Sequence, residues 1–322
     1  MEQPLVSIIM AARDTAVYLP PCLDSIINQS YPHWELIAVN DNSIDETRST
    51  LDRYARKDKR IRVFNSPGQK LIPALQEGYR KSNGSLINRM DSDDRMPFDK
   101  LETLVNHWRQ HGKGSVIAGG TEHFVDKGEV GGGFRKYELW LNQVAREQRH
   151  LEEIYKECVI PSHCWIMHRE DFETIGAFDP PVYPEDYDLC FRIYRQGLKI
   201  VGIDHILHYW RDRTNRISRT WDCYKDNRYF ELKVKYFYQL DRRSNRPLVL
   251  WGAGRNGKDL AKLLLERETE LHWVCDNDQK IGKDIYQTRL HDPNSLKNLD
   301  FPQVIIAVSS PQAQVHIRKQ LA

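Results

Sequence analysis

A short acidic segment in the first third of the chain has the residue types that metal-dependent chemistry needs. Residues 87–97 read Ile-Asn-Arg-Met-Asp-Ser-Asp-Asp-Arg-Met-Pro, so Asp91, Asp93 and Asp94 directly follow an apolar run. Carboxylates repel one another, and such a cluster is favourable where a divalent cation and a phosphate lie. Oxygen ligands of this kind suit Mg²⁺ or Mn²⁺. An ordinary acidic turn is the alternative interpretation of an isolated Asp-x-Asp-Asp string.

Two further polar groups follow predicted strands nearer the N-terminus. Residues 11–14 (Ala-Ala-Arg-Asp) follow the first strand, and residues 40–42 (Asn-Asp-Asn) follow the second. Ligands in open α/β sheets collect at the carboxyl ends of the strands. Each group alone fits a polar turn, but the three together predict a crevice that binds a nucleotide and a metal ion.

The elements that must position these groups alternate between strand and helix. A short apolar run predicts a strand covered on both faces at residues 5–10, and further strands are predicted at residues 34–39, at residues 61–65 and immediately before Asp91. Amphipathic patterns predict helices at residues 19–27, 46–57, 73–82 and 186–196. This alternation predicts a mainly parallel sheet with right-handed crossovers. The pattern loosens between residues 113 and 160, where glycines predict a turn-rich insertion and residues 138–157 predict a helix.

A second α/β cassette begins at Pro247, after a charged, aromatic helix predicted at residues 221–241. Gly252, Gly254 and Gly257 form a Gly-x-Gly-x-x-Gly turn between a predicted strand and a predicted helix, which is the context of a dinucleotide-binding turn. Asp276 follows about 20 residues later, where a ribose-binding acid is expected. The cassette has only about 75 residues, roughly half of a dinucleotide-binding domain, so a module used for packing or dimerisation is the alternative.

Bulk properties narrow the class of protein. A chain of 322 residues fits two domains, and its net charge of +2 gives no electrostatic case for nucleic acid binding. No apolar run approaches 18 residues, and we expect no signal peptide at the N-terminus. The six cysteines lack paired Cys-x-x-Cys spacing, which favours reduced thiols. We therefore expect a cytoplasmic protein; attachment at the inner face of the cytoplasmic membrane stays open.

Four segments, in this order, resemble motifs of the family 2 inverting glycosyltransferases with the GT-A fold. They are residues 6–9, 39–47, 89–94 and 184–189, and the resemblance covers roughly residues 4–220. It implies an α/β architecture: a GT-A domain at residues 1–222, a helical linker at 223–246 and a small Rossmann-like domain at 247–322. The last resembles small nucleotide-binding units attached to some sugar-modifying enzymes.

The resemblance also implies roles for individual residues. Asp186 would be the catalytic base, Asp93 the main metal ligand and Asp41 a contact of the nucleobase. The expected substrate-binding residues are Ala11, Arg13, Asp41, Arg89, Asp91, Trp165, Glu185 and Arg211. The expected metal ligands are Asp91, Asp93 and His208, and the expected second nucleotide site comprises Gly252, Gly254, Gly257 and Asp276.

Physical reasoning agrees with the two main roles and leaves alternatives for three residues. A departing nucleoside diphosphate develops negative charge that a divalent cation stabilises, and an acceptor hydroxyl needs a carboxylate to take its proton. Asp186 follows Pro184 at a helix start, where it could instead cap the helix. Trp165 suits either a sugar-stacking role or the core, and His208 either a metal or phosphate contact or simple packing.

Three positions depart from the family pattern. Residues 10–14 replace the usual Pro-x-Tyr-Asn after the first strand, so Arg13 would have to stack on the base or pair with phosphate. Asn40 stands where an aspartate is common. Arg213 stands two residues after Arg211, where a histidine is frequent.

These features together predict a Mn²⁺- or Mg²⁺-dependent inverting glycosyltransferase. It would move a sugar from a nucleotide-diphosphate donor to a hydroxyl of a glycan or lipid-linked acceptor, in bacterial surface polysaccharide synthesis. A sugar nucleotidyltransferase is one alternative, but it needs a glycine-rich loop that residues 10–14 do not supply. A nucleotide-binding module without transferase activity is another. A nicotinamide-dependent oxidoreductase would leave residues 1–220 without a role. Peripheral membrane contact and homo-oligomer formation stay open.

Overall fold

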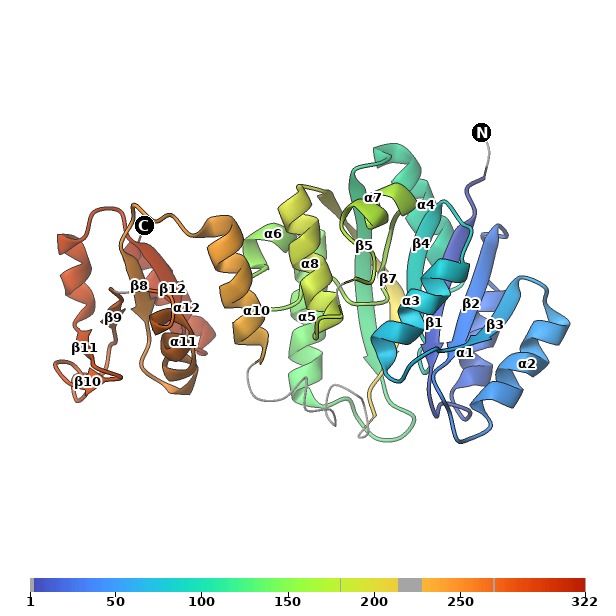
Figure 1. The fold of residues 1–322 in the computed structure, drawn as a ribbon, viewed down its shortest axis with the longest axis horizontal. Coiled ribbons are helices and arrows are strands. Elements are labelled where there is room, and N and C mark those ends of the chain that lie inside the picture. Colours follow the sequence, from blue (N-terminus) through green and yellow to red (C-terminus); the bar gives the residue numbers. More distant parts are fainter. Residues whose placement is uncertain (1–2, 180, 214–227, 269, 322) are drawn as a thin grey trace. The chain divides into compact units, whose positions relative to one another are not determined.

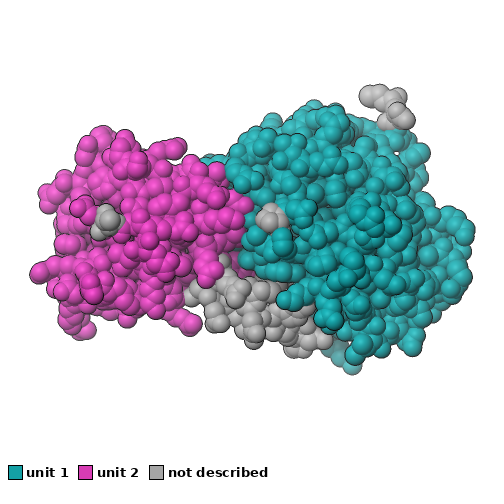
Figure 2. All heavy atoms as spheres, viewed as in Figure 1, with its two compact units in different colours: residues 1–220 teal, residues 221–322 magenta. Residues whose placement is uncertain are grey.

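The structure is a computed structural model, and it describes residues 3–179, 181–213, 228–268 and 270–321. The chain divides into two compact units, residues 1–220 and 221–322 (Figure 2). Most of the basic stretch at residues 211–219, and the first part of the helix predicted at 221–241, lie outside the described residues. In the part that is described, no helix has the length and apolar character needed to span a membrane.

The first unit is built on a seven-stranded sheet in which the order is β3-β2-β1-β4-β6-β5-β7 (Figure 1). The strands are β1 Val6–Ala12, β2 Trp34–Asn40, β3 Ile61–Asn65, β4 Leu86–Asp91, β5 Ser115–Phe124, β6 Trp165–His168 and β7 Lys199–Arg211. Only β6 runs antiparallel to its neighbours in this sheet. The predicted mainly parallel sheet is confirmed.

Helices cover both faces of this sheet, as continuous apolar strands require. They are α1 Leu19–Ile27, α2 Thr47–Lys57, α3 Leu71–Lys81, α4 Lys100–His111, α5 Gly132–Arg146, α6 His150–Glu153, α7 Arg169–Thr174 and α8 Glu185–Gln196. Residues of α1, α2 and α4 share one core with Ile8 and Leu36. Helix α3 packs on the opposite face, where a Cβ at Gly78 would lie 2.8 Å from Ile9 Cγ2.

The expectation for residues 113–160 was wrong in two respects. Residues 115–124 form β5, a buried strand rather than part of a loose insertion. Gly119 and Gly120 obscure its apolar pattern because glycine disfavours strands, yet a Cβ at Gly119 would lie 2.3 Å from Leu207 Cδ1 of β7. The predicted helix at 138–157 is instead α5 and the short α6, separated at Gln148, which has a positive φ of 57°.

The second unit has a five-stranded sheet in the order β10-β11-β9-β8-β12. Its strands are β8 Leu248–Trp251, β9 His272–Val274, β10 Asp284–Ile285, β11 Thr288–His291 and β12 Gln303–Ile306. Its helical segments are α10 Arg228–Tyr236, the π-helical η2 Phe237–Asp241, α11 Arg255–Leu265, the 3₁₀ turn η3 Pro293–Asn298 and α12 Pro311–Leu321. Val234 of α10 belongs to the core around β8 and α11. The described part of the segment expected as a linker is therefore part of this unit.

Candidate active site

The carboxyl ends of β1, β2 and β4 lie side by side, and they bring the three predicted polar groups to one edge of the sheet. In the strand register Ala11 is opposite Asp91, and Ala12 is opposite Asn40. The backbone N–H of Asp41 donates to the carbonyl of Ala12 over 2.8 Å. Ala11 thus borders the acidic segment, as a residue beside a bound donor would.

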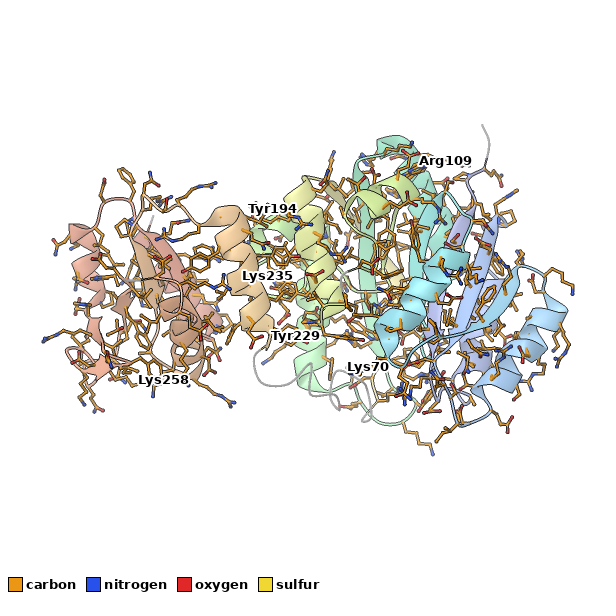
Figure 3. All side chains as sticks on the ribbon, in the orientation of Figure 1. Lys70, Arg109, Tyr194, Tyr229, Lys235 and Lys258 are labelled. Carbon is orange, nitrogen blue, oxygen red and sulfur yellow. The ribbon has the colours of Figure 1, made fainter. Side chains whose placement is uncertain are left out.

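Asp41 and Arg13 approach each other at the end of β2. Asp41 is 3% exposed, and its Oδ2 accepts from the backbone N–H of Lys70 over 3.2 Å. Lys70 precedes α3 (Figure 3). Arg13 Nη1 lies 3.7 Å from the same oxygen, and the Arg13 side chain is exposed. One exposed cation and one buried carboxylate therefore stand at this corner, and the Arg13 guanidinium can reach a ligand from solvent.

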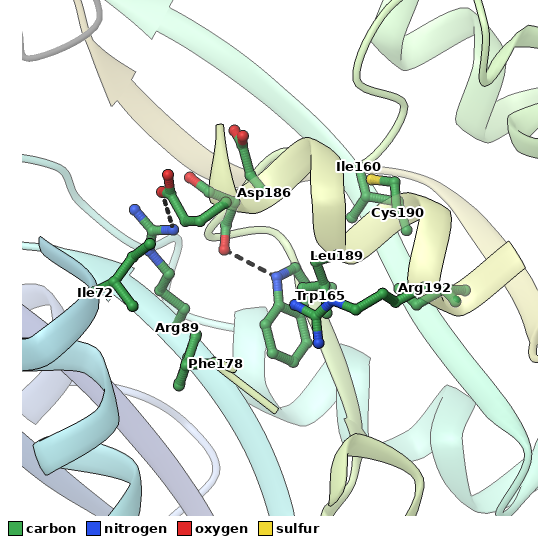
Figure 4. Close-up of a pocket in the computed structure, with 12 residues that line it drawn as sticks. Ile72, Arg89, Ile160, Trp165, Phe178, Asp186, Leu189, Cys190 and Arg192 are labelled. Carbon is green, nitrogen blue, oxygen red and sulfur yellow. Dashed lines mark hydrogen bonds and ion pairs between the residues drawn. The ribbon is translucent and has the colours of Figure 1, made fainter. Parts of the chain in front are cut away.

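Arg89 joins the acidic segment to the start of α8. Its Nη1 donates to Glu185 Oε1 over 2.9 Å (Figure 4). Its Nε donates to Asp91 Oδ1 over 3.0 Å. The Arg89 side chain is buried, so this bridge between residues distant in sequence is well shielded from water. The neighbouring Arg89 guanidinium and His163 hold the pKa of Asp91 below its ordinary value, against the effect of burial. Asp91 is therefore ionised throughout the neutral range.

Asp186 has the environment of a general base. Burial and the negative charge of the adjacent Glu185 raise the pKa of its carboxyl to about 7, although Arg89 acts in the opposite direction. Its Oδ1 accepts from the backbone N–H of Tyr187 over 2.8 Å. A base whose pKa lies near neutrality is best matched to proton transfer at neutral pH. Pro184 is the N-cap of α8 and no side chain caps this end of the helix, so Asp186 does not act as the cap.

A second cluster lies behind the acidic segment and is fully buried. His208 Nε2 is 2.9 Å from Asp94 Oδ2, and its Nδ1 is 3.1 Å from Lys100 Nζ. His163 stacks on His208 with ring centroids 3.5 Å apart. Burial lowers the pKa of Lys100 to about 8 and that of His163 to about 4, and it also lowers the pKa of His208. A neutral His208 accepts from Lys100 and donates to Asp94.

Two groups of side chains in this region carry donor atoms that could hold a divalent cation. Asp94, His163 and His208 have ligand atoms that lie within 4.8 Å of one another, and His163 Nε2 is buried without a hydrogen-bond partner. However, both nitrogens of His208 are already engaged, and both oxygens of Asp94 accept hydrogen bonds, from His208 and from the Arg211 backbone. The carboxylates of Asp91 and Asp93 are more exposed, at 26% and 16%. They are the members of the predicted metal set that solvent reaches.

The arginines at the end of β7 hold the acidic segment in place. The Arg211 backbone donates to Asp94 Oδ1, and its Nε donates to the carbonyl of Asp93, each over 2.7 Å. Its side chain is only 4% exposed and also pairs with Asp126. Arg211 was expected to bind substrate, and in this conformation it shapes the Asp93–Asp94 turn. Arg213, which follows β7 and has a side chain that is 17% exposed, donates from its Nε to Asp93 Oδ2.

Trp165 lines the pocket beside Asp186, together with Arg89, Ser162 and Phe178 (Figure 4). It is 1% exposed, and its Nε1 donates to the carbonyl of Ser162 over 2.9 Å. The indole is thus covered, which matches the core alternative rather than an open stacking platform.

Lys100 is the residue of this site that sequence reasoning did not identify. It occupies the apolar face of α4 together with Leu101, Leu104 and Val105, and it is 0% exposed. A lysine four residues before Leu104 lies on the same side of the helix. A cation on the buried stripe of an amphipathic helix was the signal available in the sequence.

The second unit places its glycine turn as predicted, between β8 and α11. Gly252 has φ 121°, and a Cβ at Gly257 would lie 2.0 Å from the carbonyl oxygen of Gly252. A Cβ at Gly254 would meet nothing within 4 Å, and Gly254 precedes the first turn of α11 without a side-chain cap. Asp276 accepts from Trp251 Nε1 over 2.9 Å, so this carboxylate is already held within the fold.

Comparison with known sequences identifies the first unit. The profile described as "Glycosyl transferase family 2" matches residues 7–176. An uncharacterized glycosyltransferase of Haemophilus influenzae is 32% identical over 200 residues, which cover 60% of this chain and 61% of that protein. TuaG of Bacillus subtilis, whose name places it in teichuronic acid biosynthesis, is 36% identical over 101 residues, or 31% of this chain and 40% of TuaG. The match thus spans about three fifths of the first relative and less of the second.

Solved structures share the fold at low sequence identity. TarS of S. aureus in complex with UDP-GlcNAc superposes with a TM-score of 0.57 at 17% identity, over 81% of this chain and 71% of that one. A mannosyltransferase from Pyrobaculum calidifontis, in complex with GDP-Man and Mn²⁺, gives a TM-score of 0.56 at 18% identity, over 76% and 66% of the two chains. At these identities the likeness supports the architecture.

Proposed function

The chain belongs to glycosyl transferase family 2, and we propose that it transfers a sugar from a nucleotide-diphosphate donor to a hydroxyl of a glycan or lipid-linked acceptor, with inversion. The observation that carries this proposal is Asp186, a carboxyl with a pKa of about 7 beside the Arg89 bridge to Asp91. One base close to the donor site is what a single displacement needs.

In the proposed reaction Asp186 takes the proton of the acceptor hydroxyl as that oxygen attacks the sugar. Arg89 and Glu185 hold the start of α8 against β4, which fixes the position of Asp186 relative to the acidic segment. Ionised Asp186 is the competent form, because a protonated carboxyl has no place for the hydroxyl proton. Attack from the side opposite the leaving group gives the inverted product.

The donor would lie along the carboxyl ends of β1, β2 and β4. Asp41 and Arg13 stand where the nucleoside would be, and Asp91 and Asp93 would hold a divalent cation, Mn²⁺ or Mg²⁺. When bound, such an ion stabilises the negative charge of the departing diphosphate. The oxygen donors of the two carboxylates suit either ion.

The comparisons support this donor class and suggest an acceptor class. The two solved structures contain UDP-GlcNAc in one case and GDP-Man with Mn²⁺ in the other. TuaG is named as a putative glycosyltransferase of teichuronic acid biosynthesis. We therefore place the acceptor among bacterial surface polysaccharides or their lipid-linked precursors, with the reaction on the cytoplasmic side. Membrane contact and self-association stay predictions.

A panel of nucleoside diphosphates, with and without Mn²⁺, tests the proposal on the full chain. We expect Mn²⁺-dependent thermal stabilisation by one nucleotide, loss of that response in Asp93→Asn, and hydrolysis or transfer of the matching nucleotide sugar. If no nucleoside diphosphate stabilises the protein with either ion, the transferase proposal is wrong. A response to a nucleoside triphosphate and a sugar phosphate would favour the nucleotidyltransferase alternative.

We also propose a phosphate-bearing ligand for the glycine turn of the second unit. Gly254 leaves open space at the start of α11, where backbone N–H groups and the helix dipole favour an anion. Lys280, whose Nζ donates to the carbonyl of Ala253, adds a positive charge beside the turn. The Gly254→Ala variant described in the Discussion tests this site separately from the first.

A further inference from the structure

Arg213 forms an ion pair with the carboxylate that we expect to bind the metal ion. Its Nε donates to Asp93 Oδ2 over 2.7 Å, and the two side chains are 17% and 16% exposed. The guanidinium carbon also lies 5.2 Å from the centre of the Tyr18 ring, on the loop between β1 and α1. Asp93 therefore faces a cation supplied by the chain itself.

The other carboxylates of the acidic segment are held differently. Asp94 is 1% exposed and bound by the Arg211 backbone and His208, which fix the turn. Asp91 is held by Arg89, which is only 7% exposed and also pairs with Glu185. Breaking either arrangement would disturb buried structure. The contact of Arg213, in contrast, lies at the partly exposed end of the segment.

Arg211 and Arg213 contact different groups of Asp93. Arg211 donates to the backbone carbonyl of Asp93, so it sets the shape of the turn without using the carboxylate. Arg213 binds Oδ2 of the Asp93 carboxylate, which is the group through which a divalent cation would bind Asp93. A guanidinium and a metal ion on the same carboxylate repel each other, so the two compete.

We propose that Arg213 is a displaceable counter-ion of Asp93, which a divalent cation must displace and whose freed guanidinium then binds the donor diphosphate. This inference rests on the proposed function of the same site. A guanidinium presents paired donors that match phosphate oxygens, and it keeps its charge at any physiological pH. Because Arg213 starts beside Asp93, it lies next to any diphosphate that a metal ion on Asp93 would bridge.

If the metal ion displaces Arg213, the binding of the metal ion and the binding of the nucleotide depend on each other. Without nucleotide, the metal must displace the Arg213 guanidinium from Asp93, and no phosphate is present to receive it. With nucleotide present, the displaced guanidinium gains a diphosphate partner, so each ligand favours the other. Free metal would therefore bind weakly to the empty protein and more tightly in the presence of the nucleoside diphosphate.

The test compares Mn²⁺ binding to the full chain and to Arg213→Ala, followed through the electron paramagnetic resonance signal of free Mn²⁺. We expect the variant to bind Mn²⁺ about tenfold more tightly than the wild type without nucleotide, and UDP or GDP about tenfold more weakly at saturating Mn²⁺. Arg213→Lys keeps a competing charge and should stay close to the wild type in the first measurement. Arg146→Ala, which removes an exposed pair with Asp204, should change neither value.

The Asp93→Asn variant tests the metal assignment separately from the role of Arg213. If this variant loses Mn²⁺ binding while Arg213→Ala leaves the nucleotide-free affinity unchanged or lowers it, the role of Arg213 is wrong and the metal assignment stands. If Asp93→Asn binds Mn²⁺ like the wild type, the metal assignment under the proposed function fails instead. Should Arg213→Ala not fold, Arg213→Gln gives the same comparison with a side chain of similar length.

Discussion

The two units of this protein differ in the groups that lie at the carboxyl ends of their parallel strands. In the first unit the carboxyl ends of β1, β2 and β4 carry carboxylates and the cations that pair with them, such as Asp91 with Arg89. In the second unit the corresponding edge, after β8, carries a glycine turn with no bulky side chain between Gly252 and Gly254. The first edge therefore presents charged side chains, and the second presents backbone groups.

This difference predicts how each edge responds to mutation. A side-chain site can lose its chemistry without losing its fold, because the backbone that carries it is set by buried strands. In a site built from backbone groups, a substitution that removes binding also tends to disturb the fold, because the geometry depends on the absence of Cβ atoms. Substitutions at the first edge should therefore change reaction rate, and substitutions at the second should change stability unless they fall where space is open.

The largest effect should come from Asp186→Asn. The amide cannot accept the acceptor proton, so we expect kcat to fall about 10³-fold, while the affinity for the nucleoside diphosphate and the melting temperature stay near wild-type values. Steady-state kinetics and thermal shift with the nucleotide check both parts. Asp204→Asn, at an exposed pair on β7, is the matched control and should keep full activity. A parallel loss of nucleotide binding would mean that Asp186 acts on the donor rather than as the base.

A pair of glycine variants tests the backbone site of the second unit. Gly257→Ala would place a Cβ 2.0 Å from the carbonyl of Gly252, and we expect it to destabilise this unit by about 3 kcal/mol. Gly254→Ala meets open space and should cost less than about 1 kcal/mol. Hydrogen exchange of peptides from β8 and α11 measures both. If Gly254→Ala also leaves every nucleotide response of the second unit intact, the turn serves packing and not ligand binding.

Lys100→Met tests whether charge at the first edge also supports the fold. The variant removes the donor to the His163 carbonyl, at 2.8 Å, and to His208. Two buried acceptors are left without a partner, so we expect a loss of about 2 kcal/mol in urea unfolding. Lys113→Met, which breaks an exposed pair with Glu170, should change stability by less than about 0.5 kcal/mol. Equal effects of the two variants would show that the buried cluster is not structural.

The sequence predicted which residues follow the strands better than it predicted the contacts between those residues. Asp91 and Asp41 were found because each lies in a polar segment at the end of a predicted strand, and the glycine turn because its spacing is tied to a strand and a helix. The bridge from Arg89 to Glu185 joins residues far apart in the chain, and no local pattern encodes such a pairing.

The residues missed by sequence reasoning share one physical cause. Strand β5 was overlooked because Gly119 weakens its local signal, although the close approach of Leu207 requires that glycine. Lys100 was overlooked because a charged residue on an apolar helix face looks like an exception. In both cases a tertiary contact overrides the local preference. The acidic residues and Arg89 were among the expected site residues, whereas Lys100 and the pairing of these charges were not.

The smallest and most diagnostic effect should come from Glu185→Gln. The negative charge of Glu185 raises the pKa of Asp186, which lies at about 7, so its removal lowers that pKa. Arg89, which loses its Glu185 partner, then acts on Asp186 in the same direction. Because ionised Asp186 is the active form, the acidic limb of the plot of kcat against pH should move to lower pH by about one unit. This shift corresponds to about 1.4 kcal/mol in the free energy of ionising Asp186. Glu152→Gln, on the exposed end of α6, should leave the profile in place. A limb that stays at pH 7 in Glu185→Gln would show that a group other than Asp186 sets the pH dependence, and the side-chain interpretation of the first edge would then need another base.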